Sequence, residues 1–269
     1  MKPFRHLLFA AGTLLAMQSC SVAQSPGGSQ PKTVLLDYYF NNEYKKDASG
    51  NMVRFHYTWE DPANSGFSMW GERFRAAGAK TDSLPVAPTK ENLAKASVYI
   101  IVDADTEKET AHPNYIQAND IKAITEWVKQ GGVLVMLAND SGNAEFKHFN
   151  QLANKFGIHF NEDRYHLVFN NKYEQGAFIV PANHPLLPNV KKIFLKEIST
   201  LTVQQPARSV FDDNGKVIMA VSKYGKGTVL AIGDPWIYNE YIDGKRLPAE
   251  YENPQAATDL ANWLLKQAK

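Results

Sequence analysis

Four apolar segments of the sequence each lead into a group of carboxylate and carboxamide side chains. In chain order the groups are Asn41, Asn42 and Glu43; Asp103 and Asp105; Asn139, Asp140, Asn143 and Glu145; and Asp234, Trp236, Tyr238, Asn239 and Glu240. Carboxylates and amides match sugar hydroxyls as hydrogen-bond partners, and aromatic faces stack on sugar rings. Asn and Asp also occupy ordinary turns and helix caps. Any one of these residues, taken alone, is interpreted as structural. Taken together, as groups that converge in space, they are interpreted as a carbohydrate site.

Acid–base chemistry is the first catalytic hypothesis. Two carboxyl groups on either side of a glycosidic bond can hydrolyse it, and the candidates are Asp103, Asp140, Glu145 and Asp234. The same oxygens could gather calcium; otherwise no cofactor is expected, because no pair of histidines has zinc spacing. A serine nucleophile is a weaker alternative, since Ser141 lies near the turn but the pattern Gly-x-Ser-x-Gly is absent. His184, before Pro185 in a turn, is a further candidate ligand contact.

The elements that must position these residues alternate along the chain. Apolar runs predict strands over 33–40, 81–84, 97–103, 132–138 and 228–234. Amphipathic spacing predicts helices over 65–77, 89–96, 119–130, 143–156 and 253–269. This alternation is typical of an α/β fold, with a mostly parallel sheet and helices on both faces. The carboxyl ends of parallel strands meet at one edge, where such folds bind ligands.

Several local features refine this prediction. Short strands and turns between residues 193 and 224 predict an antiparallel extension of the sheet. Ser141 or Gly142 is expected to cap the helix that follows, with Glu145 in its first turn. Asn253 is expected to cap the last helix, with Pro254 at its first position. The long polar segment around Phe55–Trp59 is large for a loop inside a compact domain and is expected to be functional.

The first thirty residues predict export. A basic start and a short apolar run over residues 1–20 are typical of a signal peptide. Cys20, the only cysteine, follows in a sequence that resembles a loose bacterial lipobox, so we expect its lipidation and an outer-membrane anchor. Residues 21–32 form a Ser, Gly, Gln and Pro-rich tether, and residues 33–269 a single domain. No acidic residues follow Cys20 closely, which favours the periplasmic side over the cell surface.

The overall charge limits the partners. The chain of 269 residues has 29 Lys and Arg against 28 Asp and Glu. Nucleic-acid binding requires a basic face, so a near-neutral chain argues against it.

A resemblance to a known family covers residues 32–267. It rests on the run from Leu36 to Glu43, on Phe55–Glu60, on Gly131–Val135 with Asn139 and Asp140, and on Gly233–Tyr241. The sequence resembles the domain appended to some unsaturated rhamnogalacturonyl hydrolases of Bacteroidetes. More distantly it is similar to glutamine-amidotransferase-like and ThuA-like domains, which implies a flavodoxin-like fold. Amidotransferases place a cysteine at the turn that is Ala138-Asn139-Asp140 here, so glutaminase chemistry is not implied.

The resemblance implies a role in pectin breakdown. The hydrolase activity of those two-domain proteins belongs to a helical barrel, for which this chain has no room. We therefore expect an exported protein that acts on or binds rhamnogalacturonan-related oligosaccharides. The alternative is a non-catalytic accessory domain that docks on a helical-barrel hydrolase through the Phe55–Trp59 loop.

Overall fold

The computed structural model describes residue 1 and residues 30–269. The expected signal peptide, Cys20 and nearly all of the tether lie outside the described residues. Residues Pro31–Lys269 form one compact unit. Within the described part of the chain, no helix combines the length and the apolar character needed to cross a membrane.

A nine-stranded sheet forms the centre of this unit, and the expected mostly parallel arrangement is confirmed. Its parallel strands, in spatial order, are β4 (Lys80–Leu84), β1 (Thr33–Asp37), β5 (Val98–Val102), β6 (Val133–Leu137) and β13 (Gly227–Ile232). The last residues of β5, β6 and β13 pair in register, Val102 with Leu137 and Leu137 with Ile232. These strands therefore end level with one another, and the polar groups that follow share one edge.

The antiparallel extension is also confirmed. It consists of β12 (Lys216–Tyr224), β10 (Leu201–Val203), β7 (Ile158–Phe160) and β11 (Ala207–Asp213). Two smaller ladders stand apart from the main sheet: β2 (Tyr44–Lys46) with β3 (Met52–Arg54), and β8 (Ala177–Ile179) with β9 (Lys192–Phe194).

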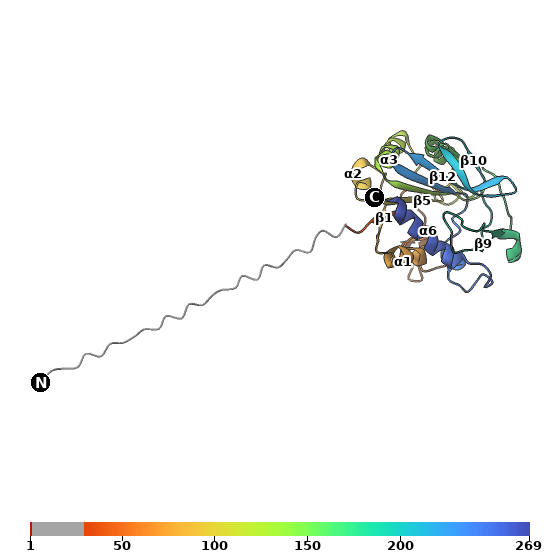
Figure 1. Cartoon of the computed structure of the whole chain (residues 1–269), viewed down its shortest axis with the longest axis horizontal. Coiled ribbons are helices and arrows are strands. Elements are labelled where there is room, and N and C mark those ends of the chain that lie inside the picture. The colour runs from red at the N-terminus through yellow and green to blue at the C-terminus, as the bar shows by residue number, and fades with distance from the viewer. Residues whose placement is uncertain (2–29) are drawn as a thin grey trace. The chain divides into compact units, whose positions relative to one another are not determined.

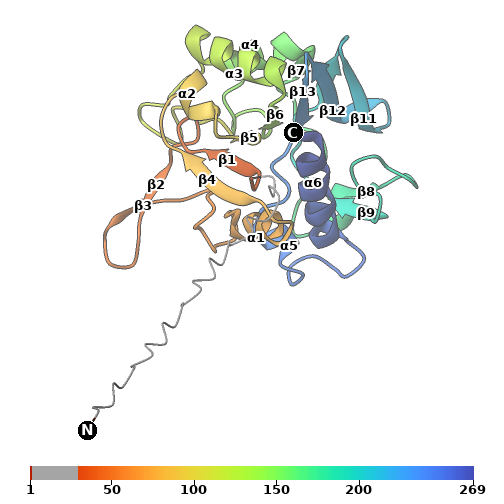
Figure 2. The same cartoon turned by 60° about the vertical axis from the view of Figure 1, so that its left-hand side comes forward.

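Helices cover both faces of the sheet (Figures 1 and 2). They are α1 (Ser68–Ala76), α2 (Lys90–Leu93), α3 (Ala118–Gln130), α4 (Phe146–Ala153), α5 (Asn239–Ile242) and α6 (Asn253–Gln267), with 3-10 turns η1 (Asn154–Phe156) and η2 (Tyr173–Gly176). Figure 2 shows α1 and α6 on one side and α3 and α4 on the other. The molecule is thus a three-layer α/β fold of the flavodoxin-like kind.

The alternation of side chains along each strand divides the core in two. On β1, Val34 and Leu36 pack in the cluster that contains α1 and α6, and Leu35 packs in the cluster that contains α3 and α4. Because successive side chains of a strand point to opposite faces, a fully apolar run is required when both faces are covered. Trp70 of α1 is fully buried in the first cluster, and Phe149 of α4 is buried in the second.

Three local predictions are wrong. The helix predicted from 143 begins at Phe146, and its cap is Glu145 rather than Ser141 or Gly142. Asn253 does not cap α6 but lies inside it, where its side chain accepts a hydrogen bond from Phe194 N at 2.8 Å and donates one to Phe194 O at 2.9 Å. The β2–β3 hairpin and the short helix α5 lack a strong periodic pattern and were not predicted.

Candidate ligand-binding site at the carboxyl edge of the sheet

The carboxyl edge of the parallel strands brings together buried acidic side chains from neighbouring strand exits. Asp103 and Asp105 follow β5, and Asp234 follows β13; all three are at most 4 % exposed. Asn41, after β1, donates from Nδ2 to the Asp103 carbonyl oxygen at 3.2 Å. The topology of the sheet therefore brings these strand exits together, as the sequence predicts.

Asp103 combines a buried carboxyl group with an unusual backbone conformation. Its backbone φ is +44°, a left-handed conformation that non-glycine residues rarely adopt and that is concentrated at functional sites. Asn139 donates from Nδ2 to Asp103 Oδ2 at 3.2 Å, and Asp103 Oδ1 has no hydrogen-bond partner. Burial raises the pKa of Asp103 well above its usual value, and the charge of Glu109 raises it further. Both effects favour the neutral form of this carboxyl group.

Asp105 and Asp234 are perturbed in the same direction. Asp105 accepts a hydrogen bond from Asn42 N at 2.8 Å, and burial raises its pKa to about 7. Asp234 accepts one from Lys196 N at 2.9 Å, and burial raises its pKa to about 8. The Oδ1 atom of Asp105, like that of Asp103, is buried without a partner. Buried polar atoms are normally paired, so these oxygens are exceptional.

Tyr57 is a member of the site that the sequence did not predict. Its pKa is raised well above the usual value by burial and by the charges of Asp103 and Asp234, which places its hydroxyl group near two strand exits. Its ring packs edge-on against Tyr238, with centroids 5.9 Å apart. Tyr57 and His56 both adopt positive φ, +48° and +58°. The only signal in the sequence was the length of the loop that contains them.

Ion pairs surround the buried carboxyl groups. Glu43 Oε1 lies 2.6 Å from His56 Nδ1, and the His56 side chain is 33 % exposed. Asp140, wholly buried, pairs with Nε of the half-exposed Arg164 and accepts a hydrogen bond from Asn143. Glu43, Asn139, Asp140 and Asn143 therefore belong to the edge, as predicted, and Arg164 joins them from the loop after β7. No motif in the sequence distinguishes Arg164.

Four predicted site residues have structural roles instead. Glu145 caps α4: its Oε2 accepts hydrogen bonds from His148 N at 3.0 Å and from Phe149 N at 3.3 Å. The ring of Trp236 is fully buried in the core, so its face is not available to a sugar.

His184 and Asn239 are the other two. His184 Nε2 donates to Val210 O at 2.9 Å, and Nδ1 accepts from Leu187 N at 3.1 Å, so the ring is fully occupied in its own turn. Burial also lowers its pKa, consistent with a neutral ring. Asn239 Oδ1 accepts from Met69 N at 3.0 Å and its Nδ2 donates to Ala63 O at 2.9 Å, which ties α5 to the start of α1.

Replacing Asn239 with alanine is expected to destabilise the protein by about 2 kcal/mol, because it leaves the half-buried Met69 N–H without its acceptor and removes the bonds from Asn239 Nδ2 to Asp61 O, Ala63 O and Ser68 Oγ. Urea unfolding of this variant checks the expectation. Asn51→Ala, on an exposed turn, is the control and should change stability by less than about 0.5 kcal/mol. Wild-type stability of Asn239→Ala would show that the bridge contributes nothing.

The aromatic segment Phe55–Trp59 is folded into the domain. Tyr57 is 7 % exposed and Trp59 is 6 % exposed. Trp59 donates from Nε1 to Asp82 O at 3.0 Å, and its ring lies against Phe67, Trp70 and Phe74. The rings of Tyr57 and Trp59 therefore cover the sheet, and only Phe55 and His56 of this segment are partly exposed.

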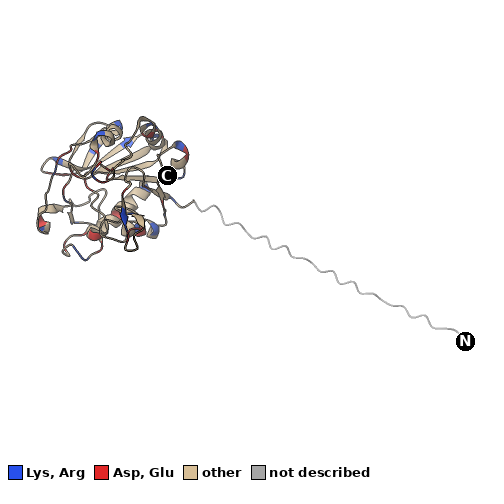
Figure 3. Cartoon of the chain, turned by 180° about the vertical axis from the view of Figure 1, so that it is seen from behind, with Lys and Arg blue, Asp and Glu red and all other residues tan. Residues whose placement is uncertain are grey.

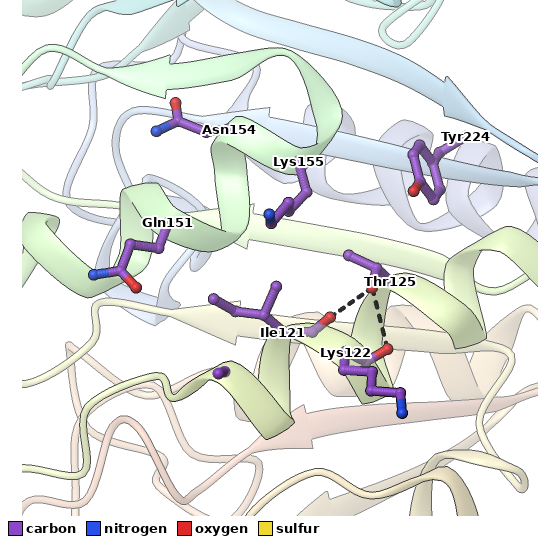
Figure 4. A pocket seen from close by; sticks show the side chains of 8 residues that line it. Ile121, Lys122, Thr125, Gln151, Asn154, Lys155 and Tyr224 are labelled. Atoms are coloured by element: carbon purple, nitrogen blue, oxygen red, sulfur yellow. Dashed lines mark hydrogen bonds between the residues drawn. The ribbon is translucent and has the colours of Figure 1, made fainter.

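A surface cavity of about 740 Å³ lies away from these residues, between α3 and the α4–η1 segment (Figure 4). Its polar lining includes Lys122, Lys155 and Tyr224. Thr125 is turned towards its own helix, where Oγ1 donates to Ile121 O at 2.7 Å. The residues of this cavity include none of the predicted site residues.

Charged side chains of both signs are mixed over the described part of the chain. Figure 3 shows basic and acidic positions interspersed over the elements on the side displayed. Across residue 1 and residues 30–269, His, Cys, Asp and Glu do not gather in groups of three or more that could hold a metal ion.

Comparison with solved structures identifies the same fold elsewhere. The mmIFT52 N-terminal domain matches with a TM-score of 0.62 and 20% identity, over 87% of this chain and 97% of that one. The cytoplasmic protein STM1381 from Salmonella typhimurium LT2 matches with a TM-score of 0.58 and 16% identity, over 88% of this chain and 100% of that one. A β-galactosidase from Rahnella sp. R3 matches with a TM-score of 0.53 and 15% identity, over 88% of this chain but 31% of that one. At these identities the likeness is one of fold alone.

Sequence comparison gives the family. No curated protein matches the sequence. A family model described as a domain of unknown function, DUF4350, matches residues 60–244, which is more than half of the chain. The match begins just after the Phe55–Trp59 segment and ends just after α5. The chain belongs to the DUF4350 family.

Proposed function

We propose that the carboxyl edge of the sheet binds an oligosaccharide of the pectin type, related to rhamnogalacturonan. The observation that carries this proposal is the set of buried carboxyl groups at the strand exits, among which Asp103 and Asp105 each keep an oxygen without a partner. A sugar hydroxyl can both donate and accept, so it can pair with carboxyl, amide and basic side chains alike. Partly exposed side chains at the rim, such as His56, Asn139 and Arg164, are the first contacts for such a ligand.

The setting of this activity follows from the start of the chain. We propose export through the signal peptide over residues 1–20, lipidation at Cys20, and anchoring to the outer membrane on its periplasmic side. Lys32, the last residue of the tether, donates from Nζ to Leu265 O at 2.7 Å and to Ala268 O at 2.8 Å, at the end of α6. The chain thus enters the domain at the amino-terminal edge of the sheet, opposite the proposed site.

Catalysis by the same groups is the enzymatic form of the proposal. A carboxyl group with a raised pKa can act as a general acid, and a neighbouring ionised carboxylate can act as a base or nucleophile. Asp103 and Asp234 fit the acid role because burial raises the pKa of each. Asp140, which pairs with Arg164, is the candidate for the second carboxyl group. Glu145 is no longer a candidate because it caps α4.

The second candidate is a non-catalytic accessory domain for a helical-barrel unsaturated rhamnogalacturonyl hydrolase. It is favoured by the family resemblance described above. Its docking surface on the Phe55–Trp59 segment would be limited to Phe55 and His56. The likeness to a β-galactosidase is a likeness of fold and adds no substrate to either form of the proposal.

The test is incubation with saturated and unsaturated rhamnogalacturonan oligosaccharides, scored by calorimetry for binding and by product analysis for turnover. Tyr57→Phe is expected to weaken binding about tenfold, because it removes one hydrogen bond in a buried site. Tyr224→Phe is the matched control, since Tyr224 pairs with Gly227 at the opposite edge of the sheet, and it should bind like the wild type.

The outcomes separate the alternatives. Binding with turnover supports the enzymatic form, and binding without turnover supports the accessory form. Absence of any interaction with both kinds of oligosaccharide would overturn the proposal. Equal weakening in Tyr57→Phe and Tyr224→Phe would remove the ligand from this edge.

A further inference from the structure

We infer that the amino-terminal edge of the sheet binds the anionic head groups of a phospholipid bilayer. The amino-terminal edge is the side at which the parallel strands begin, opposite the carboxyl edge. This inference rests on the proposed anchoring at Cys20, because it specifies how the anchored domain lies on its membrane. Two observations carry it: the place where the tether enters the domain, and the sign of the charges around that place.

Basic residues from three different elements lie at the amino-terminal edge. Lys80 begins β4, and Lys226 comes directly before β13. A helix that connects two parallel strands runs back from the carboxyl edge, so α3 ends at the amino-terminal edge, with Lys129 in its last turn. Lys226 N donates to the carbonyl oxygen of Lys129 at 3.0 Å, so these two residues are neighbours.

Two further cations extend this group onto the antiparallel hairpin. Lys223 stands next to Tyr224, the last residue of β12, and its Nζ donates to Gln267 Oε1 at 3.0 Å, at the end of α6. Arg208 lies near the start of β11. Burial lowers the pKa of Lys223, and the nearby charge of Arg208 lowers it further. Like charges that repel each other in this way indicate a region of positive potential.

Acidic side chains do not balance this group. Among the described residues, no ion pair involves the five cations of this edge: Lys80, Lys129, Lys223, Lys226 and Arg208. Asp82 is already matched, with 2.6 Å between its Oδ2 and Lys95 Nζ. Glu126, three residues before Lys129, offsets one charge, and Lys269 carries the terminal carboxylate of this chain as well as its ammonium group. The edge therefore stays positive.

The carboxyl edge differs, because acids accompany its cations. Asp140 pairs with Arg164 there. Lys108, in the loop after β5, stands between Glu107 and Glu109 in the sequence. Although both signs of charge are mixed over the molecule, the unbalanced group of cations is the one at the amino-terminal edge.

The tether enters the domain at this same edge. The carbonyl oxygen of Lys32 accepts a hydrogen bond from Lys80 N at 2.8 Å, and Lys32 Nζ donates to Ala268 O at 2.8 Å. Residues 21–31 separate Lys32 from Cys20, and a chain of that length spans at most about 40 Å. A lipid at Cys20 therefore keeps the cations of this edge close to a bilayer, which makes the bilayer surface the partner of matching charge.

The lipid and the basic edge would act together. Clusters of about four to eight Lys or Arg residues beside a membrane anchor are typical of binding to anionic lipid, and each such residue strengthens binding about fivefold. The attraction reaches only about 8 Å at physiological ionic strength, so it selects the edge that faces the membrane. With the amino-terminal edge on the bilayer, the carboxyl edge points away from it, where an oligosaccharide in solution can reach the proposed site.

The test measures binding of residues 21–269, which lack the lipidation site, to vesicles by co-sedimentation. Vesicles that contain phosphatidylglycerol should bind the protein, and vesicles of phosphatidylcholine alone should not. Binding should be lost at about 0.5 M salt, where charges are screened within about 4 Å. Lys129→Gln combined with Lys226→Gln should weaken binding to the anionic vesicles about 25-fold, which is about fivefold for each charge removed.

Lys108→Gln combined with Lys147→Gln is the matched control. It removes the same charge from exposed positions near the carboxyl edge, in the loop after β5 and in the first turn of α4. This double variant should bind vesicles like the wild type. Urea unfolding should give wild-type stability for both double variants, because all four side chains are exposed.

The outcomes separate the inference from the proposals on which it rests. Salt-sensitive binding to anionic vesicles alone, weakened only in the first double variant, supports it. No binding to anionic vesicles, equal binding to both kinds of vesicle, or equal weakening in the two double variants would overturn it. So would binding of a soluble oligogalacturonate that depends on Lys129 and Lys226 when the anionic vesicles are not bound.

The proposed function has its own measurements. Calorimetry with rhamnogalacturonan oligosaccharides reports on the carboxyl edge, and that result stands whether or not vesicles bind. Mass spectrometry of the intact wild-type protein reports on the lipid at Cys20. If Cys20 carries no lipid, the proposed anchoring is wrong and the inference fails with it.

Discussion

Replacing Asp234 with asparagine is expected to stabilise the protein by on the order of 4 kcal/mol at pH 9 and by only about 1 kcal/mol at pH 5. Burial raises the pKa of Asp234 from 3.8 to about 8. A group whose pKa is raised in the folded state contributes stability that is fully present below the unfolded pKa and is lost as the pH rises through the folded pKa. At pH 9 the wild-type protein must hold a buried carboxylate, whereas asparagine stays neutral and still accepts the hydrogen bond from Lys196 N.

Urea unfolding at pH 5, 7 and 9 measures this effect. Wild-type stability should fall across the range, because Asp37, Asp105 and Asp234 have pKa values raised to about 6, 7 and 8. The fall should be clearly smaller in Asp234→Asn. The exposed Asp212→Asn should retain the wild-type slope. If Asp234→Asn keeps that slope as well, Asp234 is ionised in the folded protein at neutral pH and the acid role proposed for it is wrong.

The second large effect is expected at Gly233, between β13 and Asp234. A Cβ atom at this position would lie 1.8 Å from the carbonyl oxygen of Ser199, and Ser199 N donates to the Gly233 carbonyl oxygen at 3.0 Å. Alanine therefore cannot fit unless these two backbone segments separate. We expect Gly233→Ala to lose about 4 kcal/mol or more, the range of substitutions that force a buried backbone apart.

The control for this variant is Gly50→Ala in the turn of the β2–β3 hairpin. Nothing lies within 4 Å of a Cβ atom there, but φ is +84°. Alanine should cost about 1–2 kcal/mol through its left-handed backbone alone. The free energies of unfolding of both variants in urea separate the effect of the contact with the Ser199 carbonyl oxygen from the general effect of losing a glycine. Similar losses in the two would mean that the Ser199 contact is not what requires glycine at 233.

The paired ends of the strands explain why much of the site was predictable. An apolar run followed by Asp or Asn can be recognised in the sequence, and the topology of parallel strands brings such ends to one edge of the sheet. Asp103, Asp105, Asn139, Asp140 and Asp234 were found in this way. Local patterns failed where a side chain serves a distant part of the chain: Asn253 bonds Phe194, and Asn239 bonds Met69 and Ala63.

The sequence by itself determined the layers, because periodicity and glycine stops are local properties of the chain. Gly131, with φ +127°, ends α3 where the sequence predicts, and the five residues of β6 that follow are all buried. The tertiary structure alone decided which polar side chains are available to a ligand. Burial and unpaired oxygens depend on what packs around a side chain, so only the fold removes Glu145, His184 and Trp236 from the candidate site and adds Tyr57 and Arg164. At the carboxyl edge, the surroundings of each Asp and Asn side chain decide its role. Some of these side chains bridge two parts of the fold, and others are buried carboxyl groups that can accept a proton or bind a hydroxyl group.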